Sequence, residues 1–217
     1  WGLIRSLASK QLYCSDGDLF FYRFGCLEDV KSRLISPNVL LVIGFSYCHK
    51  PFECPAGRFT DACVRDLDSP VCGQCFIGKC VHALPDARVE PLFITTVHYI
   101  GEKMIEAHDR WPDREILFLI TACELTLEMF GKLGHAVGFQ GVGVRLGGQI
   151  CNTMPAFKAS ERGLKPGMAV VNDDAQADMM ALIRAFAESV VSDSRTVSLA
   201  STPPSRRDDI IASDRRG

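Results

Sequence analysis

The sequence predicts an α/β domain built on a mostly parallel central sheet. Short apolar runs of strand length recur along the chain, and after residue 90 they alternate with segments that have the period of an amphipathic helix. Alternation of strands and helices of this length is typical of a parallel sheet with right-handed crossovers. We therefore expect a Rossmann-like architecture in the broad sense.

The strands are predicted from the apolar runs. "VLLVIGF" at 39–45 is apolar and rich in β-branched residues, which suits a strand buried on both faces. "PLFITTV" at 91–97 and "EILFLIT" at 115–121 have the same character. "GFQGVGVRL" at 138–146 is a third strand after residue 90, and "GMAVV" at 167–171 is the fourth.

Three helices are predicted between and after these strands. Apolar side chains recur along one face of 98–111 and of 124–134. The last helix is expected at 175–191, where apolar residues form a stripe and Asp173 or Asp174 serves as the N-cap.

The chain divides into three parts. Residues 1–37 have no clean period, and we expect an N-terminal extension there. Residues 38–191 form the cysteine-rich α/β domain. Residues 192–217 are rich in Ser, Arg, Asp and Pro and cannot bury enough apolar surface to offset their ordering entropy, so we expect a disordered tail.

Charge and hydropathy narrow the classes of partner. The formal net charge of -2, from 24 Lys and Arg against 26 Asp and Glu, argues against nucleic acid or an anionic membrane as the main partner. The longest apolar runs fall far below the roughly 20 residues that a bilayer-spanning helix needs. We expect a cytoplasmic protein, in which thiols stay reduced and clustered cysteines indicate metal binding or catalysis.

Six cysteines follow the first predicted core strand. They lie in "CHKPFECPAGRFTDACVRDLDSPVCGQCFIGKC", from Cys48 to Cys80. The end of this segment has the spacing C-x2-C-x4-C, which reverses the plant-type ferredoxin spacing. Two thiolates separated by two residues can turn toward one metal or cluster face, so the segment predicts a metal-binding loop inserted after this strand.

Further cysteines follow other predicted strands. Cys48, Cys123 and Cys151 each come shortly after a strand, and the carboxyl ends of parallel strands meet at the ligand-binding edge of such a sheet. We therefore expect them to converge near the loop. The predicted ligand set is Cys48, Cys54, Cys63, Cys72, Cys75, Cys80, Cys123 and Cys151. This set suffices for two [4Fe–4S] clusters, for one cluster with a zinc site, or for one larger cluster.

The same motifs carry a family resemblance. "YCHKPFECPAGRFTDAC", "CGQCFIG", "ITACELTLEMF" and "QICNT" resemble the successive signatures of an uncharacterised cysteine-rich prokaryotic family, the domain-of-unknown-function family 116, over about residues 38–160. The resemblance implies a cytoplasmic α/β protein that binds metal, as iron–sulfur, through Cys48, Cys54, Cys72, Cys75, Cys123 and Cys151. Cys63 and Cys80 match that pattern less closely, and the family implies no reaction.

Three functional hypotheses follow. The first is an iron–sulfur protein with one or two [4Fe–4S] clusters at the sheet edge, which exchanges electrons with a redox partner protein or carries out reductive chemistry as an enzyme. The second is a zinc-stabilised protein-interaction module, and the third is a thiol redox protein that uses Cys72 and Cys75. The sequence does not choose between an enzyme and an accessory protein, and it carries no signature of oligomeric state.

Overall fold

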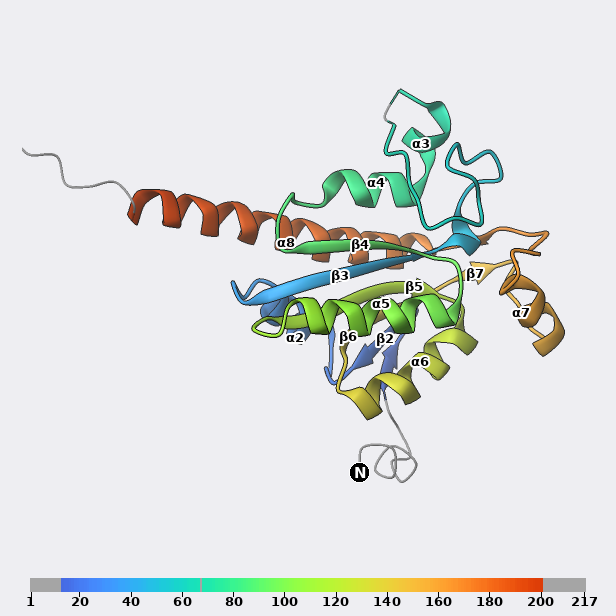
Figure 1. Cartoon of the computed structure of the whole chain (residues 1–217), viewed down its shortest axis with the longest axis horizontal. Helices are drawn as coiled ribbons and strands as arrows, with labels where there is room; N and C mark the ends of the chain where they lie inside the picture. Colours follow the sequence, from blue (N-terminus) through green and yellow to red (C-terminus); the bar gives the residue numbers. More distant parts are fainter. Residues whose placement is uncertain (1–12, 67, 201–217) are drawn as a thin grey trace, which may run out of the picture.

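The computed structural model describes residues 13–66 and 68–200, and these form an α/β fold around a mostly parallel sheet (Figure 1). The sheet order is β1-β2-β6-β5-β3-β4. Strands β6, β5, β3 and β4 are parallel, whereas β2 pairs antiparallel with β6, and β1 with β2. The strands are β1 (Cys14–Asp16), β2 (Leu19–Tyr22), β3 (Val39–Ser46), β4 (Val89–Ile94), β5 (Glu115–Ala122) and β6 (Gln140–Arg145).

Strand β3 lies in the middle of the parallel part. All of its residues are buried, as expected for its apolar and β-branched sequence. The chain continues from β3 to β4 on one side, and then returns to form β5 on the other side. The carboxyl ends of β3 and β5 therefore flank the point where the strand order reverses, which is where open α/β sheets bind ligands.

Helices cover both faces of the sheet (Figure 1). Because side chains alternate along a strand, Leu41, Ile43 and Phe45 of β3 face one core layer, whereas Leu40 and Val42 face the other. The first layer includes α2 (Leu27–Leu34), α4 (Phe76–Ala83) and α8 (Asp173–Ala200), and the second includes α5 (Val97–Arg110) and α6 (Glu124–Val137). Among the helices described, none combines the length and the apolar character needed to cross a bilayer.

The segment predicted as an N-terminal extension belongs to the domain from residue 13 onward. It supplies β1, β2 and α2, and each residue of β2 is buried. Strand β2 pairs with β6 from Tyr22↔Gly141 to Leu19↔Val144. The prediction of an extension was therefore wrong for residues 13–37. The four residues of β2 are too few to show a period in the sequence, although pairing with β6 buries them. Residues 1–12 lie outside the described part.

Two further expectations change at the C-terminal end. The strand predicted at 167–171 is reduced to β8 (Ala169–Val170), which pairs antiparallel with β7 (Gly147–Gly148) outside the parallel sheet. Helix α8 also extends to Ala200, past residue 192, where we expected a disordered tail. Neither Gly nor Pro interrupts 173–200, so the helix can propagate with one hydrogen bond per added residue. The rest of the expected tail, 201–217, lies outside the described residues.

Candidate functional site

Seven of the eight predicted ligand cysteines gather into two groups near the carboxyl ends of the parallel strands. The edge group, which lines one cavity, consists of Cys48, Cys123 and Cys151. The loop group, which lines a second hollow, consists of Cys54, Cys63, Cys72 and Cys75. In Figure 1 the segment that carries the loop group, including α3 (Pro70–Gln74), leaves the end of β3 and lies on the side of the sheet that carries α4.

The sheet positions the edge group. Cys48 lies in a short 3-10 helix (Tyr47–His49) directly after β3, and the Ser46 side chain caps this turn by accepting the Cys48 N–H at 3.3 Å. Cys123 follows β5 and is the N-cap residue of α6. Because β3 and β5 are neighbours, their ends bring together two cysteines that are remote in sequence. Cys151 enters from the loop after β7.

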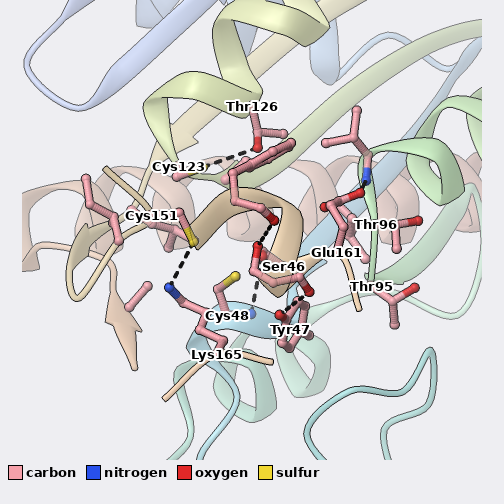
Figure 2. A pocket seen from close by; sticks show the side chains of 18 of the residues that line it. Ser46, Tyr47, Cys48, Thr95, Thr96, Cys123, Thr126, Cys151, Glu161 and Lys165 are labelled. Atoms are coloured by element: carbon pink, nitrogen blue, oxygen red, sulfur yellow. Dashed lines mark hydrogen bonds between the residues drawn. The ribbon is translucent and has the colours of Figure 1, made fainter. Parts of the chain in front are cut away.

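Polar side chains surround the three thiols (Figure 2). The Lys165 ammonium lies 3.6 Å from Cys151 Sγ and donates to the Gln149 carbonyl at 2.7 Å. Cys123 Sγ and Thr126 Oγ1 are 3.2 Å apart. Across the cavity, Glu161 accepts the Val97 N–H at 3.0 Å. The cavity measures about 40 Å³, so it holds a molecule of only a few heavy atoms without rearrangement.

Negative charge on the neighbouring thiols opposes the ionisation of Cys48. Burial raises the pKa of Cys48, and negative charge on Cys123 or Cys151 raises it further. Ser46 and Lys165 act in the opposite direction, by hydrogen bonding and by positive charge. A cation bound beside the three sulfurs would likewise favour the thiolate form of Cys48.

The loop group is built around two short helices. Cys72 is buried in α3, and Cys75 is both the C-cap of α3 and the N-cap of α4. Burial raises the pKa of Cys75, but the backbone N–H groups of Ile77 and Gly78 hydrogen-bond its sulfur and lower that pKa. N–H groups directed at a sulfur in this way are typical of metal-thiolate sites.

A buried lysine supports the loop. Lys50 is 2% exposed, and its ammonium donates to the Thr60 carbonyl at 2.7 Å, to Thr60 Oγ1 at 3.0 Å and to the Ala62 carbonyl at 2.8 Å. Burial lowers the pKa of Lys50, and negative charge on Cys54 and Cys63 raises it. Lys50 therefore fixes the backbone of the loop and places a positive charge beside its thiols.

Arg58 connects the two groups. Its guanidinium donates to the carbonyls of Cys48 at 3.0 Å and of Lys165 at 2.7 Å, and also to the Gly167 carbonyl. Its Nε donates to the Lys50 carbonyl at 3.2 Å. One side chain of the loop thus holds two backbone segments of the edge cavity.

Cys80 joins neither group. It is 0% exposed in α4, and its Sγ lies 3.7 Å from Met180 Sδ. Burial raises the pKa of Cys80 to about 12. Cys80 is buried because of its position in the helix: Ile77, Cys80 and Val81 share the face of α4 that packs on the core. The eight predicted ligands therefore divide into a set of four, a set of three and one core thiol.

The thiols are free as they stand. All ten cysteines are unpaired by disulfides. In the part of the chain that the structure describes, no group of three or more His, Cys, Asp or Glu side chains is arranged to hold a metal ion. Sequence reasoning did not find Lys165 and Glu161 as cavity residues, because no motif or spacing distinguishes either residue.

Comparison with known proteins adds no relative: no family model, curated protein or solved structure matches the chain.

Proposed function

We propose that this chain is an iron–sulfur protein that uses one [4Fe–4S] cluster on the loop group and a second on the edge group for electron transfer or reductive chemistry. The observation that carries the proposal is the gathering of seven thiols from separate segments into two groups at one edge of the sheet. A redox partner protein, a cytoplasmic location and membership of the domain-of-unknown-function family 116 belong to the same proposal.

The topology supports this interpretation. We interpret the parallel part as Rossmann-like, and the segment between β3 and β4 as a cysteine-rich metal-binding loop inserted after the first core strand. The order β4-β3-β5-β6 reverses between β3 and β5, and the edge group lies just past these two strands. Ligand sites of open α/β sheets lie at this point.

The donor chemistry of the loop group fits a cluster. Four thiols line one hollow, two backbone N–H groups face the sulfur of Cys75, and the Lys50 ammonium offsets negative charge. Hydrogen bonds to sulfur, local charge and solvent exposure set the reduction potential of such a group. The thiols would have to turn about their Cα–Cβ bonds to bind it, since their present orientations do not hold a metal ion.

The edge group offers three thiols beside a cation, and its cavity of about 40 Å³ would have to widen to hold a cluster. When bound, a cluster passes electrons one at a time. The chain's own residues have separate tasks there: Lys165 and Thr126 hydrogen-bond the sulfurs of Cys151 and Cys123, and Glu161 holds the start of α5 against the cavity. Burial raises the pKa of Glu161, and the hydrogen bond from the Val97 N–H lowers it.

A zinc-stabilised interaction module is the second candidate. The loop group favours this candidate because its four thiols come from one short segment, and a structural zinc ion is typically bound by four ligands of that kind. It leaves the edge group unexplained. A reactive Cys72–Cys75 pair is less well supported, since burial raises the pKa of Cys75 whereas a reactive thiol needs a lowered pKa.

The test is purification without oxygen, followed by a visible absorption spectrum and assays of iron, acid-labile sulfide and zinc. We expect about eight irons per chain and a broad band near 400 nm that dithionite bleaches. Cys72→Ser and Cys123→Ser should each reduce the content to about four irons, because each removes a ligand from a different group. Cys26→Ser is the matched control, since Cys26 is exposed and lies in neither group.

Two outcomes would contradict the proposal. A colourless protein with stoichiometric zinc would establish the interaction module instead. Iron content that is unchanged in both Cys72→Ser and Cys123→Ser would show that neither group holds it.

A further inference from the structure

We infer that a surface beside the edge cavity is the docking site of an acidic electron-carrier protein. The segments 51–65 and 152–170 form this surface, which we call the rim surface. The redox role of the partner rests on the proposed function, whereas the rim surface is a feature of the chain itself. The inference adds where the redox partner binds and which charge it carries.

Exposed apolar side chains are concentrated in the rim surface. Among the described residues, twelve large apolar side chains are exposed, and seven of these belong to the two segments. The segments hold only 34 of the 187 described residues, so this share is far above an even distribution. Leu164 is 66% exposed, and Phe52, Phe59 and Met168 are exposed with it. Apolar side chains gathered in this way mark sites of protein–protein interaction.

Principle contacts join the two segments into one surface. The Arg58 guanidinium donates to the Lys165 carbonyl at 2.7 Å, and its carbon lies 4.3 Å from the centre of the Phe52 ring. The Phe59 ring lies against Gly163 and leaves no room there for a Cβ. In Figure 1 the loop that follows β3 and helix α7 (Met154–Ser160) lie at the same end of the molecule.

The charge of the rim surface indicates the charge of its partner. The two segments hold five Lys and Arg residues against three Asp and Glu residues, an excess of two positive charges in a chain whose formal net charge is -2. Lys158 and Arg162 are exposed, and neither forms an ion pair with any residue that the structure describes. Cations around an apolar centre favour a partner with an acidic surface.

A protein suits this surface better than an anionic membrane does. Phe52 lies under the Arg58 guanidinium, and the Phe59 ring centre lies 4.9 Å from that of Tyr47, so both rings are held on the chain rather than free to insert into lipid. Glu53 and Asp61 are also exposed in the rim surface. Anionic lipid would repel both carboxylates, whereas a protein can place individual cations opposite them.

A second copy of the chain is a poorer occupant. A symmetric dimer would place the same surface on both sides of the interface and bring the cations of one copy against those of the other. Like charges at an interface are unfavourable, and Lys158 and Arg162 have no carboxylate partner to offset them among the described residues.

The rim surface lies beside both groups of thiols. Tyr47, which contacts Phe59, and Lys165, which follows Leu164, line the edge cavity. Two thiols of the loop group, Cys54 and Cys63, belong to the segment 51–65 itself. A carrier docked on this surface would therefore be next to both sites of the proposed electron transfer.

The experiment measures binding of an acidic plant-type [2Fe–2S] ferredoxin to the full chain by isothermal titration calorimetry, with iron assayed on the same sample. Cytochrome c, a one-electron carrier with a cationic surface, is the control carrier. We expect the ferredoxin to bind at low ionic strength and cytochrome c not to bind. Added salt should weaken the binding, because it screens the charges of the two surfaces.

Two rim variants should lower the affinity. The double variant Lys158→Glu with Arg162→Glu should weaken ferredoxin binding about 10-fold to 100-fold, because it reverses two unpaired charges. Leu164→Asp should weaken it about 10-fold, because it places a carboxylate in the apolar part of the surface. Arg184→Glu and Ile105→Asp are the matched controls, exposed on α8 and α5. The urea midpoint should be unchanged in all four variants, since the replaced side chains are exposed.

The inference is overturned if the ferredoxin does not bind the iron-loaded chain, if cytochrome c binds as tightly, or if both rim variants bind like the wild type. Binding to phosphatidylglycerol vesicles that the rim variants lose would identify a membrane instead, and a dimer that Leu164→Asp dissociates would identify a second copy. In all of these cases the iron content of the wild-type protein leaves the proposed function standing. A protein without iron would instead overturn the proposed function, and with it the redox role of the docked partner.

Discussion

The two groups of thiols are held in different ways. The loop group comes from 54–75, and local interactions position it: the Lys50 ammonium, two short helices and the N–H groups near Cys75. The edge group comes from positions far apart in the chain: the pairing of β3 with β5 positions Cys48 and Cys123, and the loop after β7 brings in Cys151. Strands within the core are the most resistant parts of a fold, whereas loops open more easily.

We therefore expect the two groups of thiols to respond differently to substitutions. A single substitution in the loop should disturb the loop group and spare the edge group, because the sheet holds the latter independently. Arg58 is the exception, since it contacts the backbone of both sites.

Lys50→Met should have the largest effect. It removes the donor to the carbonyls of Thr60 and Ala62, so we expect the free energy of unfolding of the metal-free protein to fall by about 3 kcal/mol in urea. About four irons should be lost, all from the loop group, and the iron of the edge group should be retained. Lys79→Met is the control, because Lys79 is exposed. An equal loss of iron from both groups would show that the groups are not held independently.

Gly78→Ala should have the next largest effect. A Cβ at this position would collide with the Cys72 carbonyl oxygen, so the turn that carries Cys72 and Cys75 must shift. We expect a loss of about 1–3 kcal/mol in stability, together with lower iron in the loop group.

Gly73→Ala is the matched control for that change. A Cβ on Gly73 meets no atom within 4 Å, and the residue lies in α3, so alanine should be neutral or stabilise the protein by up to about 1 kcal/mol. Similar effects of the two substitutions would rule out the close approach at Gly78 as the cause.

Arg58→Lys tests the link between the groups. Lysine keeps the charge but loses the planar fork that reaches the carbonyls of Cys48, Lys165 and Gly167. We expect a loss of about 1–2 kcal/mol, and faster reaction of thiols in both groups with a thiol reagent in the metal-free protein. Arg162→Lys, at an exposed position, is the control. Faster reaction of the loop thiols alone would show that Arg58 does not support the edge cavity.

Tyr22→Phe should have the smallest effect and should spare both groups, because Tyr22 lies in β2 and donates to the Leu127 carbonyl at 2.8 Å. Loss of this hydrogen bond should cost about 1 kcal/mol at neutral pH, with iron content unchanged.

The difference between Tyr22→Phe and the wild type should also depend on pH. Burial raises the pKa of Tyr22, so the folded protein keeps a proton that the unfolded chain releases above about pH 10. The tyrosine's contribution to stability is therefore complete below that pH and declines as the pH rises further. Urea unfolding between pH 8 and 11 should show the two proteins converging at the alkaline end; a constant difference would contradict the assignment.

Several features could be predicted from the sequence because they depend on local pattern. The apolar runs predicted β3 and β5, and cysteines just past these runs were expected at one edge because the carboxyl ends of parallel strands share it. The structure places Cys48, Cys123 and Cys151 in one cavity. The number of thiols in the loop was likewise evident from composition.

Other features depend on how distant segments pack. The position of Cys80 in α4 directs its side chain into the core. Strand β2 pairs with β6, although its four residues show no period in the sequence. Lys165 reaches the thiols through a loop that Arg58 holds in place.

By itself, then, the sequence determined the α/β class and the positions of the cysteines relative to the strands along the chain, because strand patterns and residue spacing are local properties. Only the tertiary structure decided which thiols share a cavity and which charged side chains accompany them. The reason is that these contacts join residues far apart in the chain, and the packing of the sheet and its helices sets them.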